Sequence, residues 1–309
     1  MSTSLMIGTC GWSYSPDWTG VFYPNYVKQK QFLEYYSQVF PTVEIDSSFY
    51  HIPLKSTVEG WDRRTSPEFL FSAKLPEEIT HKSKLDLSKP ETRNYLDLYL
   101  DNFSPLEKKG KMLAHLIQLP PSFKLRDHWS ILESFLNRWT EWRESIGKSL
   151  SGDQYGSHSW HPVVEFRHKS WMTEKTFELL REYHTTYCIV VEPLLPPRMD
   201  ITSNDLAYIR FHGFGSKPWW NYLFSSEELD LWARKIQQSL HDHPKIRHVA
   251  YFNNHFSGNA IKNAQDLLPR VNLKPLTDIT LLNRKFQLQS RTHKKISKST
   301  PKDSLDKWM

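Results

Sequence analysis

The sequence contains little cysteine. Only Cys10 and Cys188 occur among 309 residues, and they lie far apart in the chain. Two distant cysteines build no disulfide framework, and this usage is typical of a reducing compartment. The first residues also lack a cationic segment followed by an apolar stretch, which is the pattern of a signal peptide. We therefore expect a cytoplasmic protein.

Long apolar runs are absent as well. No run approaches the roughly 18 residues that cross a bilayer, so we expect no membrane span and no membrane partner. Hydrophobic residues still make up 39% of the chain and aromatic residues 14%, which excludes a wholly disordered protein. The 12 tryptophans suit either a packed core or a surface that stacks on flat ligands.

The body of the chain lacks net charge. The formal charge of +6 comes from 40 Lys and Arg residues against 34 Asp and Glu residues. Residues 283–309 hold eight of these cations and only two of the acids, so the preceding residues are balanced. We interpret residues 284–309 as a basic, disordered tail and residues 1–283 as one domain. Only the tail suggests a nucleic-acid partner.

Short segments rich in Val, Ile, Phe and Tyr recur along the chain and predict strands. They are 5–10, 42–47, 69–75, 112–119, 162–167, 186–192, 206–212 and 248–253. Apolar residues at helical spacing fill most of the intervals, namely 28–39, 126–146, 173–184, 226–240 and 258–268. We expect Thr173 to cap one helix and Ser226 to open another. This alternation predicts an α/β fold with a single TIM-like (β/α) barrel. A doubly wound open sheet is the alternative, disfavoured because no Gly-rich dinucleotide turn is present.

Charged and polar side chains share the inward face of these strands, close to their carboxyl ends. In 42–47, Glu44 and Asp46 alternate with Val43 and Ile45, and side chains on a strand alternate between its faces. The same parity selects Lys74, Gln118, Glu165, Arg167, Glu192, Arg210, His212 and Asn253. Buried charges must neutralise one another, meet a ligand or reach water. The pattern therefore predicts either an ion-pair network that fills the barrel or, favoured here, a functional site.

The chain lacks the common local motifs for nucleotides, metals and nucleophilic catalysis. It has no P-loop, no Gly-x-Gly-x-x-Gly, no Gly-x-Ser-x-Gly, no His-x-x-x-His and no Cys-x-x-Cys. The sequence thus requires no cofactor. A divalent metal held from separate strands stays open as a lesser alternative. Its ligands would come from Glu44, Asp46, His81, Glu165, Glu192 and His212.

Several segments resemble the domain-of-unknown-function 72 family, also called YecE-like. The segments include GTCGWSY (8–14), TVEIDSSFY (42–50), FSAKLPEEITH (71–81) and VVEFRHKSW (163–171), and the match covers about residues 5–270. The resemblance implies a TIM-like barrel and no established reaction. The family usually has Asn where this chain has Asp46, and an Asp-x-Pro-like segment at Glu192-Pro193, so this chain adds acid at the barrel mouth.

These observations favour an enzyme that performs acid–base chemistry on a small polar or anionic metabolite, such as a sugar or sugar phosphate. A hydrolase, an isomerase or a lyase fits. The candidate catalytic residues are Glu44, Lys74, Glu165 and His212. The candidate substrate-binding residues are Trp12, Tyr50, His81, Gln118, Arg167, Trp171, Arg210, Gly213, Asn253 and Asn254. The loops at 213–217 and 254–258 favour an anion. The alternatives are a nucleic-acid-acting protein and a non-catalytic ligand-binding barrel.

Overall fold

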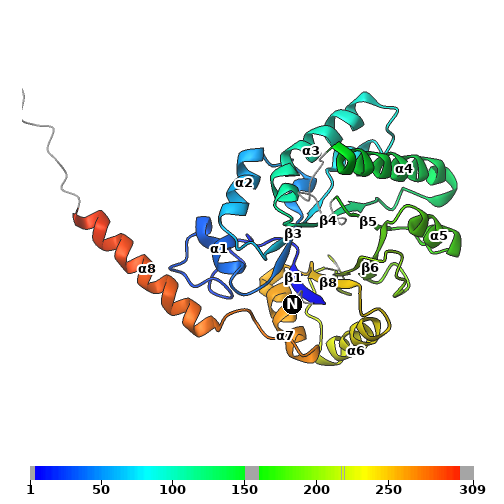
Figure 1. The fold of residues 1–309 in the computed structure, drawn as a ribbon. Coiled ribbons are helices and arrows are strands. Elements are labelled where there is room, and N and C mark those ends of the chain that lie inside the picture. Colours follow the sequence, from blue (N-terminus) through cyan, green and yellow to red (C-terminus); the bar gives the residue numbers. More distant parts are fainter. Residues whose placement is uncertain (1–3, 150–159, 217, 219, 300–309) are drawn as a thin grey trace, which may run out of the picture.

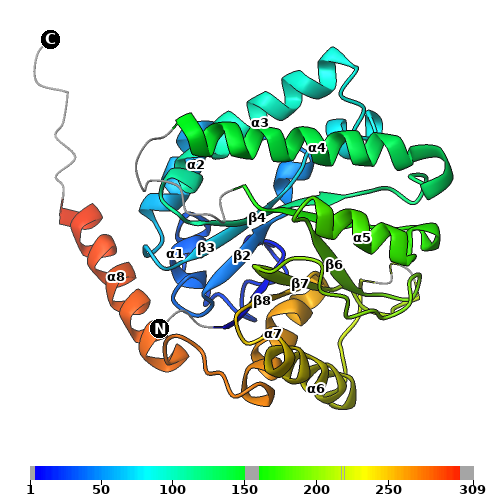
Figure 2. The same cartoon turned by 45° about the vertical axis from the view of Figure 1, so that its right-hand side comes forward.

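Eight parallel strands form a barrel in the computed structural model, which describes residues 4–149, 160–216, 218 and 220–299. All eight predicted strands are present, in the order β1-β8-β7-β6-β5-β4-β3-β2. Helices surround them (Figure 2). The predicted TIM-like barrel is therefore confirmed. The strands are β1 (Leu5–Thr9), β2 (Thr42–Ile45), β3 (Leu70–Lys74), β4 (Met112–Gln118), β5 (Pro162–Glu165), β6 (Thr186–Val191), β7 (Leu206–Phe211) and β8 (Arg247–Phe252).

The helices agree with the sequence pattern in most intervals. They are α1 (Phe32–Tyr36), α2 (Lys55–Arg63), α3 (Pro90–Lys108), α4 (Leu125–Ser149), α5 (Glu174–Glu182), α6 (Ser226–Asp242), α7 (Asn259–Arg270) and α8 (Ile279–Ser299). Thr173 caps α5 as predicted, accepting a hydrogen bond from the Thr176 amide. Helix α6 begins at Ser226 as predicted, and the preceding Ser225 is its N-cap and shares a capping box with Glu228.

Two apolar cores hold this architecture. The larger one lies between the sheet and the surrounding helices and takes the outward residues of each strand, such as Val43, Phe71 and Ile209. The smaller one fills the barrel interior and includes Leu116 and Val190. This division follows from the alternation of side chains along a strand. It leaves the inward positions at the carboxyl ends to polar residues.

The barrel closes between β1 and β2 without a regular ladder. Within the described chain these strands share one isolated bridge, between Cys10 and Glu44. The hydroxyl of Tyr36, on α1, bridges backbone groups of the two strands where they form no direct hydrogen bond. It accepts a hydrogen bond from the Thr9 amide at 2.9 Å and donates one to the Thr42 carbonyl at 3.1 Å. We call this junction the β1–β2 seam.

Replacing Tyr36 with phenylalanine should lower the free energy of unfolding by about 1–3 kcal/mol, because it leaves buried backbone groups of Thr9 and Thr42 unpaired. Urea denaturation measures the change. Tyr95→Phe is the matched control, since this tyrosine is exposed and its hydroxyl bonds to no described residue. Equal stability losses in the two variants would contradict the role of the Tyr36 hydroxyl.

Helix α8 continues past the boundary predicted at residue 284. It extends away from the barrel in both views (Figures 1 and 2). Leu282 and Phe286, four residues apart on one face, are buried, and the Tyr35 hydroxyl donates to Asn283 Oδ1 at 2.8 Å. Residues 284–299 are thus helical rather than irregular, because the apolar pair fixes the first turns against α1. Residues 300–309 lie outside the described part of the chain. None of the described helices is long and apolar enough to cross a bilayer.

Candidate functional site

Five charged residues from four strands form a chain of alternating sign at the carboxyl end of the barrel. We call it the charge network, and it consists of Glu44, Arg210, Glu165, Arg167 and Glu192. Arg210 donates to Glu44 Oε1 at 2.7 Å and to Glu165 Oε2 at 2.5 Å. Arg167 contacts the other oxygen of Glu165 and donates to Glu192 Oε2 at 2.7 Å. The predicted convergence of these residues is therefore present.

The inner end of the charge network is closed to solvent. Glu44 is fully buried and Arg210 is 1% exposed. The second oxygen of Glu44 accepts a hydrogen bond from the Tyr208 hydroxyl at 2.6 Å. Both oxygens of Glu44 therefore have partners, and no ligand can reach them in this arrangement. This placement differs from the catalytic role expected for Glu44, which here positions Arg210.

Glu165 lies between the two arginines and is also fully buried. Burial alone would raise the pKa of its carboxyl group, but Arg167 and Arg210 outweigh burial and hold that pKa well below its ordinary value. Glu165 is therefore a permanent anion near neutral pH. It orients two guanidinium groups rather than exchanging a proton, so its expected acid–base role is not supported by its surroundings.

Glu192 shares the inward parity and is a possible metal ligand in the sequence, but it is not among the predicted catalytic or substrate-binding residues. It directly follows β6 and is 3% exposed. Its Oε2 accepts from Arg167, whereas its Oε1 has no hydrogen-bond partner among the described residues. Burial raises the pKa of this carboxyl group to about 7, against the opposing effect of Arg167. Glu192 thus titrates near neutrality. Inward parity already marks Glu192 in the sequence, but parity does not reveal the environment that shifts its pKa.

His212 bridges the charge network and β8. The side-chain amide of Asn253 donates to His212 Nδ1 at 2.9 Å, and His212 Nε2 lies 3.4 Å from Glu165 Oε1. Burial, with Arg167 nearby, lowers the pKa of the imidazole to about 3. His212 is therefore neutral at physiological pH, and its ring is held from both sides.

The outer layer of the mouth consists of partly exposed cationic and polar side chains. They are Lys74, His81, Gln118, Arg167 and Asn253. The Lys74 amine lies 3.7 Å from the centre of the Phe49 ring, and burial together with Arg210 lowers its pKa to about 8. His81 packs edge-on against the same ring at 4.8 Å. Burial and the adjacent Lys74 lower the pKa of His81 to about 4.

Two predicted ligand contacts instead support the scaffold. Trp171 is fully buried, stacks on Phe166 at 4.9 Å and donates its indole N–H to the Phe123 carbonyl. Asn254 is fully buried as well and donates to Asn263 Oδ1. Neither side chain is available to a ligand in this structure, because each one packs between helices and strands behind the mouth.

The other predicted contacts lie around the rim. Trp12 is partly buried and meets Trp61 of α2 edge-on at 5.4 Å. Tyr50 is 65% exposed and follows Phe49. Gly213 turns the chain after β7 with φ of 110°, a conformation that favours glycine. Of the two loops expected to favour an anion, the first includes Lys217, which lies outside the described residues.

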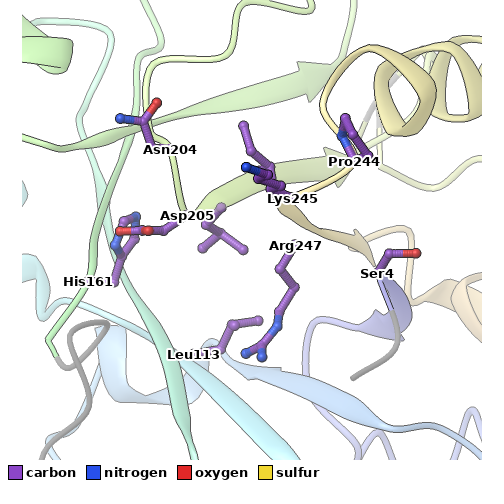
Figure 3. A pocket seen from close by; sticks show the side chains of 10 residues that line it. Ser4, Leu113, His161, Asn204, Asp205, Pro244, Lys245 and Arg247 are labelled. Carbon is purple, nitrogen blue, oxygen red and sulfur yellow. The ribbon is translucent and has the colours of Figure 1, made fainter. Parts of the chain in front are cut away.

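The charge network offers no metal site, and a cavity lies at the other end of the barrel. Within the described ranges, no three His, Cys, Asp or Glu residues form a cluster that could hold a metal ion, since the carboxylates pair with arginine. This cavity of about 220 Å³ lies at the opposite, amino-terminal end, where Lys245 precedes β8, Arg247 is its first residue and Asp205 precedes β7 (Figure 3). It is remote from the charge network.

Comparison with known proteins agrees with this architecture. The model of the family "Protein of unknown function DUF72" matches residues 6–284. The UPF0759 protein YunF of Bacillus subtilis is 24% identical over 292 residues, which cover 87% of this chain and 95% of that protein. A crystal structure of a DUF72 family protein from Thermotoga maritima is 30% identical, with a TM-score of 0.71 over 87% of this chain and 99% of that chain. A DUF72 family protein from Enterococcus faecalis has a TM-score of 0.68 at 20% identity and covers 87% of this chain and 98% of its own. The family model spans the whole barrel, and the chain therefore belongs to the DUF72 family.

Proposed function

We propose that the protein is an enzyme that binds a small anionic metabolite, of the sugar or sugar-phosphate class, at the carboxyl end of the barrel. One observation carries the proposal: the cations and amides of the outer layer are more exposed than the carboxylates of the charge network. Lys74, Arg167 and Gln118 retain partial exposure, whereas Glu44 and Glu165 have none. A ligand that approaches from solvent meets hydrogen-bond donors before it meets any acid of the charge network.

The charge balance supports an anionic ligand. The two arginines of the network face the carboxyl groups of Glu44 and Glu165, and also Glu192, which holds a proton part of the time near neutral pH. Lys74 adds one more cation, with no ion-pair partner among the described residues. A bound phosphate or carboxylate would supply the missing negative charge in a partly desolvated site, where charge-assisted hydrogen bonds are strong.

In this proposal Lys74 and His81 of the outer layer perform the acid–base chemistry, in place of the buried Glu44 and Glu165. Lys74 and His81 are accessible, and both pKa values are lowered by burial. His81 is neutral at pH 7 and can accept a proton, while Lys74 can donate one or react as an amine. Glu165 and Glu192 then serve to fix Arg167 as the anchor for the anion. Such a set suits isomerase, lyase or hydrolase chemistry.

Arg167→Met should weaken binding of sugar phosphates at least tenfold, because a charge-assisted hydrogen bond contributes about 1.5–3 kcal/mol. Calorimetric titration with glucose 6-phosphate and ribose 5-phosphate, each compared with its neutral sugar, measures the affinity. Inorganic phosphate is titrated in the same sulfate-free buffer, with buffer alone as its blank. Arg126→Met is the matched control, since the Arg126 side chain is 92% exposed.

Arg167→Lys is a second variant, and it keeps a positive charge near Glu165 and Glu192. Because the buried carboxyl groups retain a cationic partner, weaker binding by this variant does not result from unfolding. We expect intermediate affinity, because lysine cannot bind an anion in the bidentate manner of arginine. Equal binding of neutral and phosphorylated sugars by the unmodified protein would contradict the proposal.

A further inference from the structure

We propose that Lys74 forms a covalent imine with an aldehyde or ketone that also carries the anionic group bound by Arg167. This inference rests on the proposed function and deepens it, because it names the substrate class as anionic carbonyl compounds. The two-carbon and three-carbon 2-oxo acids and the phosphate esters of small aldoses and ketoses belong to that class.

The position of the amine is the first support. Lys74 is the last residue of β3 and shares the inward parity of Ser72, whose hydroxyl lies 3.1 Å from that of Tyr251 inside the barrel. Its amine therefore projects from the strand end into the mouth. It rests on the face of Phe49 and forms no hydrogen bond or ion pair within the described residues.

The buried lysine Lys111 serves as a comparison, because its amine has a structural role. The amine of Lys111 donates to the Asp62 carbonyl at 3.1 Å, to the Thr65 carbonyl at 3.2 Å and to the Thr65 hydroxyl at 2.7 Å. It also pairs with the Asp62 carboxylate at 3.0 Å. Every proton of that ammonium group has an acceptor. Lys74 has none of these acceptors, which leaves its nitrogen free to react.

The surroundings of Lys74 disfavour its protonated form. Burial and the nearby guanidinium group of Arg210 outweigh the attraction of Glu165 and lower the pKa of the amine to about 8. At pH 7 about a tenth of the molecules then carry the neutral, nucleophilic amine, several hundredfold more than for an ordinary lysine. The Phe49 ring attracts the ammonium form, in opposition to the effect of burial.

The chemistry balances without an oxidant or a reductant. The neutral amine attacks the carbonyl carbon, a C–N bond forms, and the carbonyl π electrons move to the oxygen, which takes up a proton. Loss of that hydroxyl as water, with a proton from the nitrogen, gives the imine. His81, which packs on the same Phe49 ring, is the accessible group that can accept and return these protons. A protonated imine withdraws electrons from the neighbouring carbon, as isomerase and lyase reactions need.

Reductive trapping tests the inference directly. The full-length protein is incubated separately with glyoxylate, pyruvate, glyceraldehyde 3-phosphate and dihydroxyacetone phosphate, and sodium borohydride is then added. Intact mass and peptide mapping locate the secondary amine. We expect one adduct per chain, on the peptide that contains Lys74, with a trapping rate that rises through an inflection near the pKa of about 8.

Two variants separate this site from ordinary lysine reactivity. Lys74→Met should abolish the adduct. Lys235→Met should retain it, and Lys235 is the matched control because its amine also lies over an aromatic ring, 4.5 Å from the centre of Trp232 on helix α6. Equal labelling of Lys74 and Lys235 in the unmodified protein would overturn the proposal. So would equal trapping of acetaldehyde, since it lacks the anionic group.

Thermal shift measurements with the same compounds separate anion binding at Arg167 from imine formation at Lys74. Stabilisation by the phosphate esters without an adduct on Lys74 overturns the imine and leaves the anion-binding function in place. Neither stabilisation nor an adduct overturns both. Stabilisation that depends on Arg167, together with an adduct that depends on Lys74, supports both.

Discussion

Arg210→Met is expected to lower the free energy of unfolding by about 3–5 kcal/mol, the cost of leaving a buried charge without its partner. Arg210 donates to Glu44 and to Glu165, at 2.7 and 2.5 Å, and neither carboxylate is exposed. The variant strands two anions in the barrel interior, although Arg167 still contacts Glu165. Urea denaturation at pH 7 and the melting temperature measure the loss.

Two further variants test the cause of that loss. Adding Glu44→Gln and Glu165→Gln to Arg210→Met should recover part of the stability, because the interior then holds no unpaired charge. Arg181→Met breaks an ion pair of similar length, 2.7 Å to Glu174, whose side chains are 45% and 60% exposed. It should cost less than about 1 kcal/mol. A similar loss for Arg181→Met and Arg210→Met would show that burial does not set the energy.

Glu192→Gln should make the protein more stable than the unmodified chain by about 3.5 kcal/mol at pH 8 and by about 1 kcal/mol at pH 5, and the two proteins should be equally stable only below about pH 4. The pKa of Glu192 is raised to about 7 in the folded protein, against about 4.3 in an unfolded chain. The folded state therefore binds more protons between these values, and its stability falls as pH rises through that window. Glutamine carries no proton to lose, so the variant lacks this decline.

The comparison across pH isolates Glu192 from the other titrating groups. His81 and His212 have lowered pKa values, so they destabilise the fold as pH falls below about 6.5, and they do so in both proteins. The exposed acid Glu182 provides the control, and Glu182→Gln should leave the pH profile unchanged. Parallel profiles for Glu192→Gln and the unmodified protein would contradict the raised pKa.

The sequence was sufficient to predict which side of each strand faces inward, because side-chain alternation has a fixed period. The sequence could not predict how deeply each inward side chain lies in the barrel. Glu44 and Lys74 both follow the inward parity, yet Glu44 is fully buried and Lys74 reaches the rim. The difference depends on the stagger between neighbouring strands: Glu44 is level with Ser72, two residues before Lys74. That stagger is a property of the closed barrel and is not encoded in the spacing of one strand.

Other differences have local causes. Helix α3 was not predicted, and its periodicity is diluted by polar residues and by Pro105 within it. The helical start of the tail was missed because lysine-rich composition outweighed one apolar pair, Leu282 and Phe286. The choice of Glu44 and Glu165 over Glu192 followed from motif strength. The environments of Glu165 and Glu192 shift their pKa values in opposite directions, and no sequence pattern reveals that difference.

The β1–β2 seam has a consequence for how the chain is made. β1 has its full ladder only with β8, whose residues pair from His248 to Phe252, and across the seam it has one isolated bridge and the hydrogen bonds of the Tyr36 hydroxyl. During translation β1 must therefore wait for β8 to emerge from the ribosome before it gains a regular partner. Until then the unsatisfied edge of β1 is open to chaperones and to other nascent chains, with Tyr36 as its nearest native hydrogen-bonding group.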